Sequence, residues 1–309
     1  MSIKISIIIP MYNGEKYIEN TIKKLLSQTC PFHELIIVDD GSTDKTASIC
    51  QNYAEKDRRI KVICQSNLGV VEARKLALYY STGEYISFVD SDDTMSVKMI
   101  EKLTEAMELK YVDIAVCGYE VVWDDHLERA QYEKEVTLGN TYDILDAYIN
   151  GGVRGFLWNK LYKRELFEDM QWPENMDICE DLYSNAWIVS KHPDLKVTIL
   201  PESYYQYYMY ESSATHNIEK LISPSGEWKY LTAHRLIEEL FIGDPQITRM
   251  LKISEAVLIQ YGIQMLSGGH DFSETKRALK RASLKFLFIM LKSEKSIREK
   301  IKWIYDCFL

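Results

Sequence analysis

Three short polar clusters in the first third of the chain have residue types that suit metal and nucleotide chemistry. They are Tyr12-Asn13, Asp39-Asp40 and Asp90-Ser91-Asp92. Carboxylate oxygens are hard ligands of the kind that Mg²⁺ and Mn²⁺ prefer, and a cation held by them can neutralise charge on a departing diphosphate. A carboxylate such as Asp40 can also accept a hydrogen bond from a base. The alternative for the aspartates is a turn or helix cap, and Asp93 suits capping best.

Three charged residues and one histidine elsewhere could complete such a site. Arg74 can pair with phosphate through its planar fork, or it can be a solvated surface arginine. Glu180 and Asp181 can supply a general base, or they can stabilise the first turn of a helix through its dipole. His216 can ligate the metal or contact phosphate, or it can be a surface or capping histidine.

The elements that must position these residues alternate between two patterns. Nearly continuous apolar, β-branched runs predict buried strands over 3–9, 35–38, 60–64, 85–89 and 112–117. Apolar residues at helical spacing between them predict helices near 18–26, ending near 54, over 70–80 and over 96–109. This alternation indicates βαβ units and a parallel sheet. Because ligands bind outside the carboxyl ends of such strands, the polar clusters should meet at one sheet edge.

The pattern changes in the second half of the chain. From 120 to 215 it is less regular and ends in a strand-like, tyrosine-rich stretch over 204–210. After 216 it is helical, with helices predicted over 226–241, 246–267, 273–291 and 294–306. We therefore predict an α/β domain over 1–215 and a small α-helical domain over 216–309.

Composition excludes some classes of protein. The net charge of −9 disfavours a nucleic-acid-binding protein, which needs a basic surface. The six cysteines show no metal-type spacing, which favours free thiols and a cytoplasmic location. No apolar run approaches the length of a membrane span, and the N-terminal one is too short for a signal peptide.

Charge is nevertheless uneven along the chain. Residues 274–302 hold ten Lys or Arg and three acidic residues, a balance of +7 that leaves −16 for the rest. Apolar residues at 284, 287, 288 and 291 fall on one helix face among these charges. Such a basic amphipathic segment, 273–309, could lie on an anionic membrane surface, pack on its own domain, or form a homo-oligomer contact.

Several segments together resemble the family 2 glycosyltransferases, which have the GT-A fold. They are SIIIPMYNGEKYIENTIKKLLSQT, ELIIVDDGSTDKT, QSNLGVVEARKLAL and GEYISFVDSDD, followed by FLWNKLYKRELF and ICEDLYSNAW. The resemblance covers residues 3–93 closely, extends to about 190 and fades near 215. It implies a Rossmann-like, mostly parallel sheet flanked by helices. Where many relatives have arginine or histidine after the tyrosine-rich strand, this chain has Tyr-Gln-Tyr-Tyr, with His216 nearby.

The resemblance also implies roles for individual residues. Asp181 is the expected catalytic base, with Glu180 beside it near the sugar or acceptor. Asp92 is the main metal ligand, with Asp90 and His216 as further candidates. The nucleotide-sugar is expected to contact Pro10, Tyr12, Asn13, Asp40, Asn67, Arg74, Asp90 and Ser91.

The function expected from this resemblance is inverting transfer of a hexose or N-acetylhexosamine from a UDP-sugar, assisted by Mn²⁺ or Mg²⁺. The acceptor is a hydroxyl of a glycan, a lipid-linked oligosaccharide or a glycoprotein, and no covalent enzyme intermediate is needed. One alternative is a sugar nucleotidyltransferase, although PMYNGEKY lacks the glycine-rich, basic signature expected for a triphosphate. The other is a catalytically weak nucleotide-binding partner of another transferase.

Overall fold

The computed structural model of the chain describes residues 3–173, 176, 178–210, 218–266 and 273–308. The chain divides into two compact units, 1–210 and 211–309. The sequence-based division at 215 lies a few residues beyond this boundary. Among the described residues, no helix is long and apolar enough to cross a membrane.

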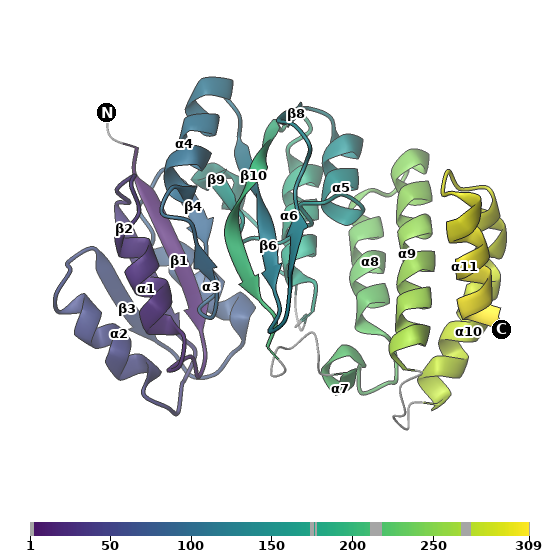
Figure 1. Cartoon of the computed structure of the whole chain (residues 1–309), viewed down its shortest axis with the longest axis horizontal. Coiled ribbons are helices and arrows are strands. Elements are labelled where there is room, and N and C mark those ends of the chain that lie inside the picture. The colour runs from purple at the N-terminus through teal and green to yellow at the C-terminus, as the bar shows by residue number, and fades with distance from the viewer. Residues whose placement is uncertain (1–2, 174–175, 177, 211–217, 267–272, 309) are drawn as a thin grey trace. The chain divides into compact units, whose positions relative to one another are not determined.

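The first unit is built on one ten-stranded sheet (Figure 1). Its main path runs β3-β2-β1-β4-β9-β6-β10-β5, with β7 beside β6 and β8 beside β10. The strands are β1 (Ile5–Met11), β2 (Glu34–Asp39), β3 (Ile60–Cys64), β4 (Tyr85–Phe88), β5 (Thr94–Met95), β6 (Ile114–Val122), β7 (Leu127–Ala130), β8 (Val136–Leu138), β9 (Lys160–Lys163) and β10 (Val197–Tyr208).

The predicted parallel half of the sheet is confirmed. β1 pairs in parallel with β2 and β4, and β2 pairs in parallel with β3. Every residue of β1 and β2 is buried, because helices cover both faces. Ile7 and Ile9 belong to the core that includes Ile22 of α1 (Ile18–Leu26), whereas the intervening Ile8 faces the opposite layer.

Helices follow the strands of this half as the sequence predicts. They are α1, α2 (Thr46–Ala54), α3 (Val70–Tyr80) and α4 (Met99–Lys110). α1 and α2 pack together, α2 also contacts β3, and α3 packs on β1 and β2. From β1 to β3 successive strands add toward one edge of the sheet, whereas β4 adds on the other side of β1. Because the crossovers are right-handed, this change of direction puts α3 on the opposite face of the sheet from α1 and α2.

The other half of the first unit contains most of what the sequence pattern missed. β9 is antiparallel to both β4 and β6, and β6 is parallel to β10. The tyrosine-rich strand begins at Val197, earlier than predicted, and ends at Tyr208. The short strands β5, β7, β8 and β9 were not predicted, nor were α5 (Thr141–Ile149), the 3-10 turn η1 (Arg164–Phe167) and the full span of α6 (Glu180–Lys191).

The second unit is helical, as predicted. Its helices are α7 (Ile218–Leu221), α8 (Lys229–Leu240), α9 (Pro245–Met265), α10 (Ser273–Leu291) and α11 (Ile297–Phe308). α9 is the central element, because α8, α10 and α11 all pack against it. Asp244 caps α9 by accepting hydrogen bonds from the backbone N–H groups of Gln246 and Ile247, and Pro245 occupies its first turn.

Candidate functional site

The carboxyl ends of β1, β2 and β4 are joined by hydrogen bonds from the loops that follow them. Asn13 accepts from the backbone N–H of Thr43 at 2.8 Å, and its own N–H donates to Ser42 Oγ at 2.8 Å. Thr21 of α1 donates to the backbone oxygen of Ser91 at 2.9 Å. The loops after β1, β2 and β4 therefore lie side by side, as the parallel arrangement predicts.

Asp40 organises the loop after β3. Its carboxylate accepts hydrogen bonds from Gln65 Nε2 and the backbone N–H groups of Leu68 and Gly69, at 2.7–2.8 Å. The sequence did not reveal this role, because the donors lie 25 to 29 residues away. Gly41 is required beside it, since it has φ +77° and a Cβ there would lie 2.8 Å from the backbone nitrogen of Asn67. Contact of Asp40 with a base stays a prediction.

The other residues expected at the nucleotide differ in accessibility. Tyr12 is 49% exposed and Asn67 is exposed, so both side chains are open to a ligand. Pro10 is buried within β1. Proline has no backbone N–H and is normally excluded from a strand that is paired on both sides. It is accommodated here because β4 pairs with β1 only as far as Ile8, so at Pro10 only β2 lies beside the strand.

The Asp90–Asp93 turn follows β4 directly. The backbone N–H of Asp90 donates to Tyr205 Oη of β10 at 3.1 Å. Asp93 does not cap a helix as predicted, since α4 begins at Met99. Its buried carboxylate instead accepts from the backbone N–H of Tyr208 at 3.0 Å, which fixes the turn against β10. Asp92 keeps a partly exposed side chain.

Arg74 is the centre of the site. Its side chain is 3% exposed, and Nη1 donates to Glu180 at 2.8 Å and to Asp181 at 2.6 Å. Its Nη2 lies 3.7 Å from Asp90. Arg74 is therefore not the solvated arginine of the alternative interpretation, and in this structure its partners are carboxylates. Binding of Arg74 to a nucleotide stays a prediction.

Glu180 and Asp181 form the first turn of α6, where the helix dipole favours negative charge. The capping interpretation and the functional one are therefore compatible. Burial and the nearby Asp181 raise the pKa of Glu180 and Arg74 lowers it, with a net pKa of about 7. Burial also raises the pKa of Asp90, and Arg74 again opposes the rise. One guanidinium thus faces three carboxylates, an excess of negative charge that a cation would relieve.

Asp90 and Asp92 suit a divalent cation held jointly with a ligand. Both are hard oxygen donors, and burial raises the pKa of Asp92 as well, a cost that a bound cation would offset. No group of three or more His, Cys, Asp or Glu side chains in the described part of the chain is arranged to hold a metal. Water and phosphate oxygens would have to supply the remaining ligands. His216 lies outside the described residues.

A buried network that the sequence analysis missed holds Asp181 from the other side. The backbone N–H of Leu157 donates to Asp181 Oδ2 at 3.2 Å. Lys160, fully buried, donates to the backbone oxygens of Arg154 and Phe156 and to the side chain of Asn159. The segment 154–157 is thereby fixed next to α6. The Trp158-Asn159-Lys160 motif was the available signal, but nothing local showed its partner.

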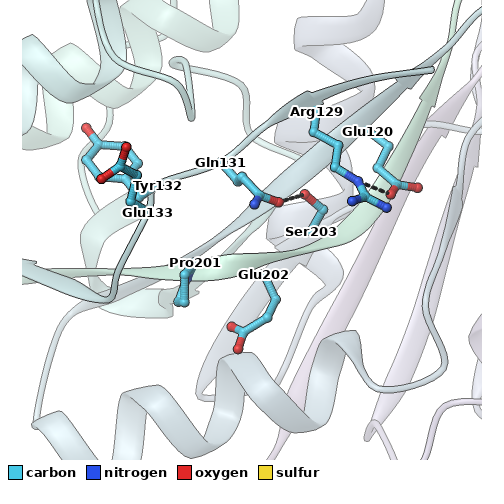
Figure 2. A pocket seen from close by; sticks show the side chains of 8 residues that line it. All are labelled: Glu120, Arg129, Gln131, Tyr132, Glu133, Pro201, Glu202 and Ser203. Carbon is cyan, nitrogen blue, oxygen red and sulfur yellow. Dashed lines mark hydrogen bonds and ion pairs between the residues drawn. The ribbon is translucent and has the colours of Figure 1, made fainter. Parts of the chain in front are cut away.

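A polar pocket of about 330 Å³ lies elsewhere in the first unit (Figure 2). Arg129 in it donates to Glu120 at 3.0 Å, and Ser203 donates to Gln131 at 3.0 Å. None of the predicted site residues lines it. Its lining residues are Glu120, Arg129, Gln131, Tyr132, Glu133, Pro201, Glu202 and Ser203.

Comparison with known families gives a direct match. The model of the family described as Glycosyl transferase family 2 matches residues 6–171, which is more than half of the chain. The chain belongs to glycosyl transferase family 2. The family predicted from the sequence segments is thus confirmed, and the matched region contains Asp40, Arg74 and the Asp90–Asp92 turn.

Two relatives of the chain are glycosyltransferases of Bacillus subtilis (strain 168). The chain is 36% identical to the uncharacterized glycosyltransferase EpsJ of Bacillus subtilis (strain 168) over 57% of this chain and 53% of EpsJ. It is 29% identical to the putative glycosyltransferase EpsH of the same organism over 76% of this chain and 69% of EpsH. It spans only about half the length of EpsJ.

Solved structures confirm the predicted GT-A fold. The crystal structure of S. aureus TarS 1–349 in complex with UDP-GlcNAc matches with a TM-score of 0.67 and 22% sequence identity. The match covers 98% of this chain and 79% of TarS 1–349. TarS 1–349 in complex with UDP matches with a TM-score of 0.63.

Proposed function

We propose that this family 2 glycosyltransferase moves a hexose or N-acetylhexosamine from a UDP-sugar to a hydroxyl group, with inversion at the anomeric carbon. The observation that carries the proposal is the ion-pair cluster in which Arg74 joins Asp181 of α6 to Asp90 at the end of β4. A residue proposed as base and a residue proposed to hold the donor are thereby fixed in one place.

The exposed groups at the sheet edge support a nucleotide donor. Tyr12 offers an open ring for stacking on a base, and Asn67 lies in the loop that Asp40 organises. Asp90 and Asp92 would hold Mn²⁺ or Mg²⁺, which when bound supplies positive charge to the departing UDP. Complexes of the structural neighbour TarS with UDP and UDP-GlcNAc support the same class of donor.

Asp181 is proposed as the general base. Arg74 and the Leu157 N–H each occupy one of its oxygens, and the remaining lone pairs are left to accept the proton of the acceptor hydroxyl. These two donors also fix the orientation of the carboxylate. The acceptor oxygen then attacks the anomeric carbon from the face opposite UDP, so one displacement completes the transfer.

The acceptor is proposed to be a hydroxyl of a glycan, either free, lipid-linked or on a glycoprotein. One relative supports a polysaccharide acceptor by its name. It is the putative teichuronic acid biosynthesis glycosyltransferase TuaG of Bacillus subtilis (strain 168), which is 40% identical over 39% of this chain and 48% of TuaG.

A panel of UDP-sugars with Mn²⁺, monitored for UDP release, tests the proposal without a known acceptor. We expect slow hydrolysis of one or a few donors. Asp181→Asn should keep UDP binding and, once a panel of candidate glycans has supplied an acceptor, should lose transfer by about 10²–10⁴-fold, the usual contribution of a general base. Asp194→Asn, an exposed aspartate beyond the other end of α6, is the matched control. Normal transfer by Asp181→Asn would refute the assignment, and pyrophosphate release from sugar phosphate and UTP would indicate a nucleotidyltransferase.

A further inference from the structure

The last two helices of the second unit each expose large apolar side chains along one face. On α10 these are Leu284, Phe288 and Leu291, which are 49–65% exposed. On α11 they are Ile297, Ile301 and Tyr305, which are 62–76% exposed. The spacings of three or four residues put each set on one helix face. We call these six residues the α10–α11 apolar face.

This face is not the one that packs inside the unit. Leu279 and Met290 of α10 are buried, as are Trp303 and Cys307 of α11. Trp303 Nε1 donates to the backbone oxygen of Ala256 in α9 at 2.7 Å, which fixes that side of α11 inward. Packing on the second unit therefore accounts for one apolar face of each helix and leaves another, which an ordinary surface helix lacks.

Basic side chains border the α10–α11 apolar face. Arg281, Lys285 and Lys302 are exposed among its members. Lys292 lies over the ring of Phe288, with Nζ 4.1 Å from the ring centroid. Residues 274–302 together carry +7, in a chain whose net charge is −9. Glu294 and Glu299 are also exposed in this segment, but Lys and Arg outnumber acidic residues ten to three over 274–302. Apolar side chains that can enter the acyl boundary, bordered mainly by cations at headgroup level, are the pattern of an interfacial helix.

We infer that the α10–α11 apolar face docks the protein on an anionic lipid bilayer, with both helices lying in the interface. A two-fold contact with a second copy would place two segments of +7 against each other, which electrostatic repulsion disfavours. An anionic leaflet instead matches both the apolar residues and the charge. The inference is independent of the transfer reaction.

Co-flotation of the full chain with vesicles tests the inference without donor or acceptor. The vesicles are phosphatidylcholine alone, or phosphatidylcholine with phosphatidylglycerol. We expect binding to the anionic vesicles only, weakened by salt. Arg281→Gln/Lys285→Gln/Lys302→Gln should reduce the partition coefficient about a hundredfold, since each basic residue near the surface contributes about fivefold. Leu284→Ser/Phe288→Ser/Ile301→Ser should reduce it at least about tenfold, because the inserted apolar area is lost.

The control is Leu109→Ser/Ile242→Ser, which removes two apolar residues outside these helices that are 73% and 83% exposed and should bind like the wild type. Circular dichroism verifies that each variant keeps its helices. The inference is overturned if the wild type and the serine variant bind anionic vesicles equally, or if neither binds. It is also overturned if light scattering shows an oligomer that the serine substitutions dissociate and vesicles are not bound.

Discussion

Glu34 and Glu180 are both largely buried carboxylates of the first unit, yet their surroundings differ. Glu34, at the amino end of β2, accepts hydrogen bonds from Ser6 Oγ, Lys61 Nζ and the N–H and hydroxyl of Thr82. These donors outweigh the cost of burial and lower its pKa to about 2. Glu180 instead accepts a hydrogen bond from Arg74, a donor that it shares with Asp181, and burial raises its pKa to about 7.

The difference separates a carboxylate that serves stability from one available for chemistry. At the amino ends of the strands, one anion meets one cation and several neutral donors. At the carboxyl ends, three carboxylates share one guanidinium. Uncompensated charge destabilises a fold. We therefore infer that the excess negative charge at this edge serves to bind a cationic or metal-bearing ligand, which would compensate it.

The largest effect is expected from removing Arg74, whose guanidinium forms ion pairs with all three carboxylates of this cluster. Arg74→Met should lower the free energy of unfolding by about 3–5 kcal/mol at pH 8, because it leaves buried charges uncompensated. Arg74 lowers the pKa of Glu180, so in the variant this pKa lies above the wild-type value of about 7, and protonation of Glu180 relieves the repulsion as the pH falls. Urea denaturation at pH 8 and pH 5 should therefore show a smaller deficit at pH 5. An equal loss of unfolding free energy at pH 8 and pH 5 would indicate that the substitution acts through lost packing instead of lost charge.

A smaller effect is expected on ligand binding when the excess charge is reduced at Asp92. Asp92→Ala should weaken UDP binding in the presence of Mn²⁺ by about a hundredfold, or about 2.8 kcal/mol, because a metal contact is lost. Removing Mn²⁺ with a chelator should weaken UDP binding to the wild type by a similar factor and should change UDP binding to Asp92→Ala only slightly. Isothermal titration calorimetry measures both, and Asp124→Ala, an exposed aspartate, is the control. Unchanged metal dependence in Asp92→Ala would refute the metal assignment.

At the opposite edge, Glu34→Gln should cost about 2 kcal/mol of stability at pH 7, because hydrogen bonds to a charged group are lost. The folded pKa lies below the unfolded one, so the contribution is present above about pH 4.5 and is lost as the pH falls through about 2. The difference in unfolding free energy between wild type and Glu34→Gln should therefore become smaller as the pH is lowered. Transfer per folded molecule should not change, and a change would contradict the purely structural role.

The smallest effect is expected from Lys75, the neighbour of Arg74 on α3. Its partner Glu72 is 2.7 Å away, but both side chains are nearly half exposed. Lys75→Met should change the unfolding free energy by less than about 0.5 kcal/mol, because water screens the pair. Comparing the unfolding free energies of Lys75→Met and Arg74→Met tests whether burial of the Arg74 charge explains the larger effect. A similar loss of unfolding free energy in both variants would show that burial does not explain it.

Much of the first unit could be predicted from local pattern. Ile3–Ile9 and the other apolar runs indicated the buried parallel strands, and the turns after them located Asp40 and Asp90. β9 could not be predicted in this way. Its four residues, which include two lysines, form a strand only because β4 and β6 lie on either side of it. The helices of the second unit were found because their apolar spacing is long and regular.

The sequence by itself determined the family, the strand–helix alternation and the set of acidic residues near the carboxyl ends of the strands. Only the tertiary structure decided their partners: Arg74 with Glu180 and Asp181, Asp40 with the loop after β3, and Lys160 with the loop that holds Asp181. The reason is the separation of these partners along the sequence. Periodicity and turn propensity act over a few residues, whereas the Arg74–Asp181 contact joins residues 107 apart and exists only once the sheet has assembled.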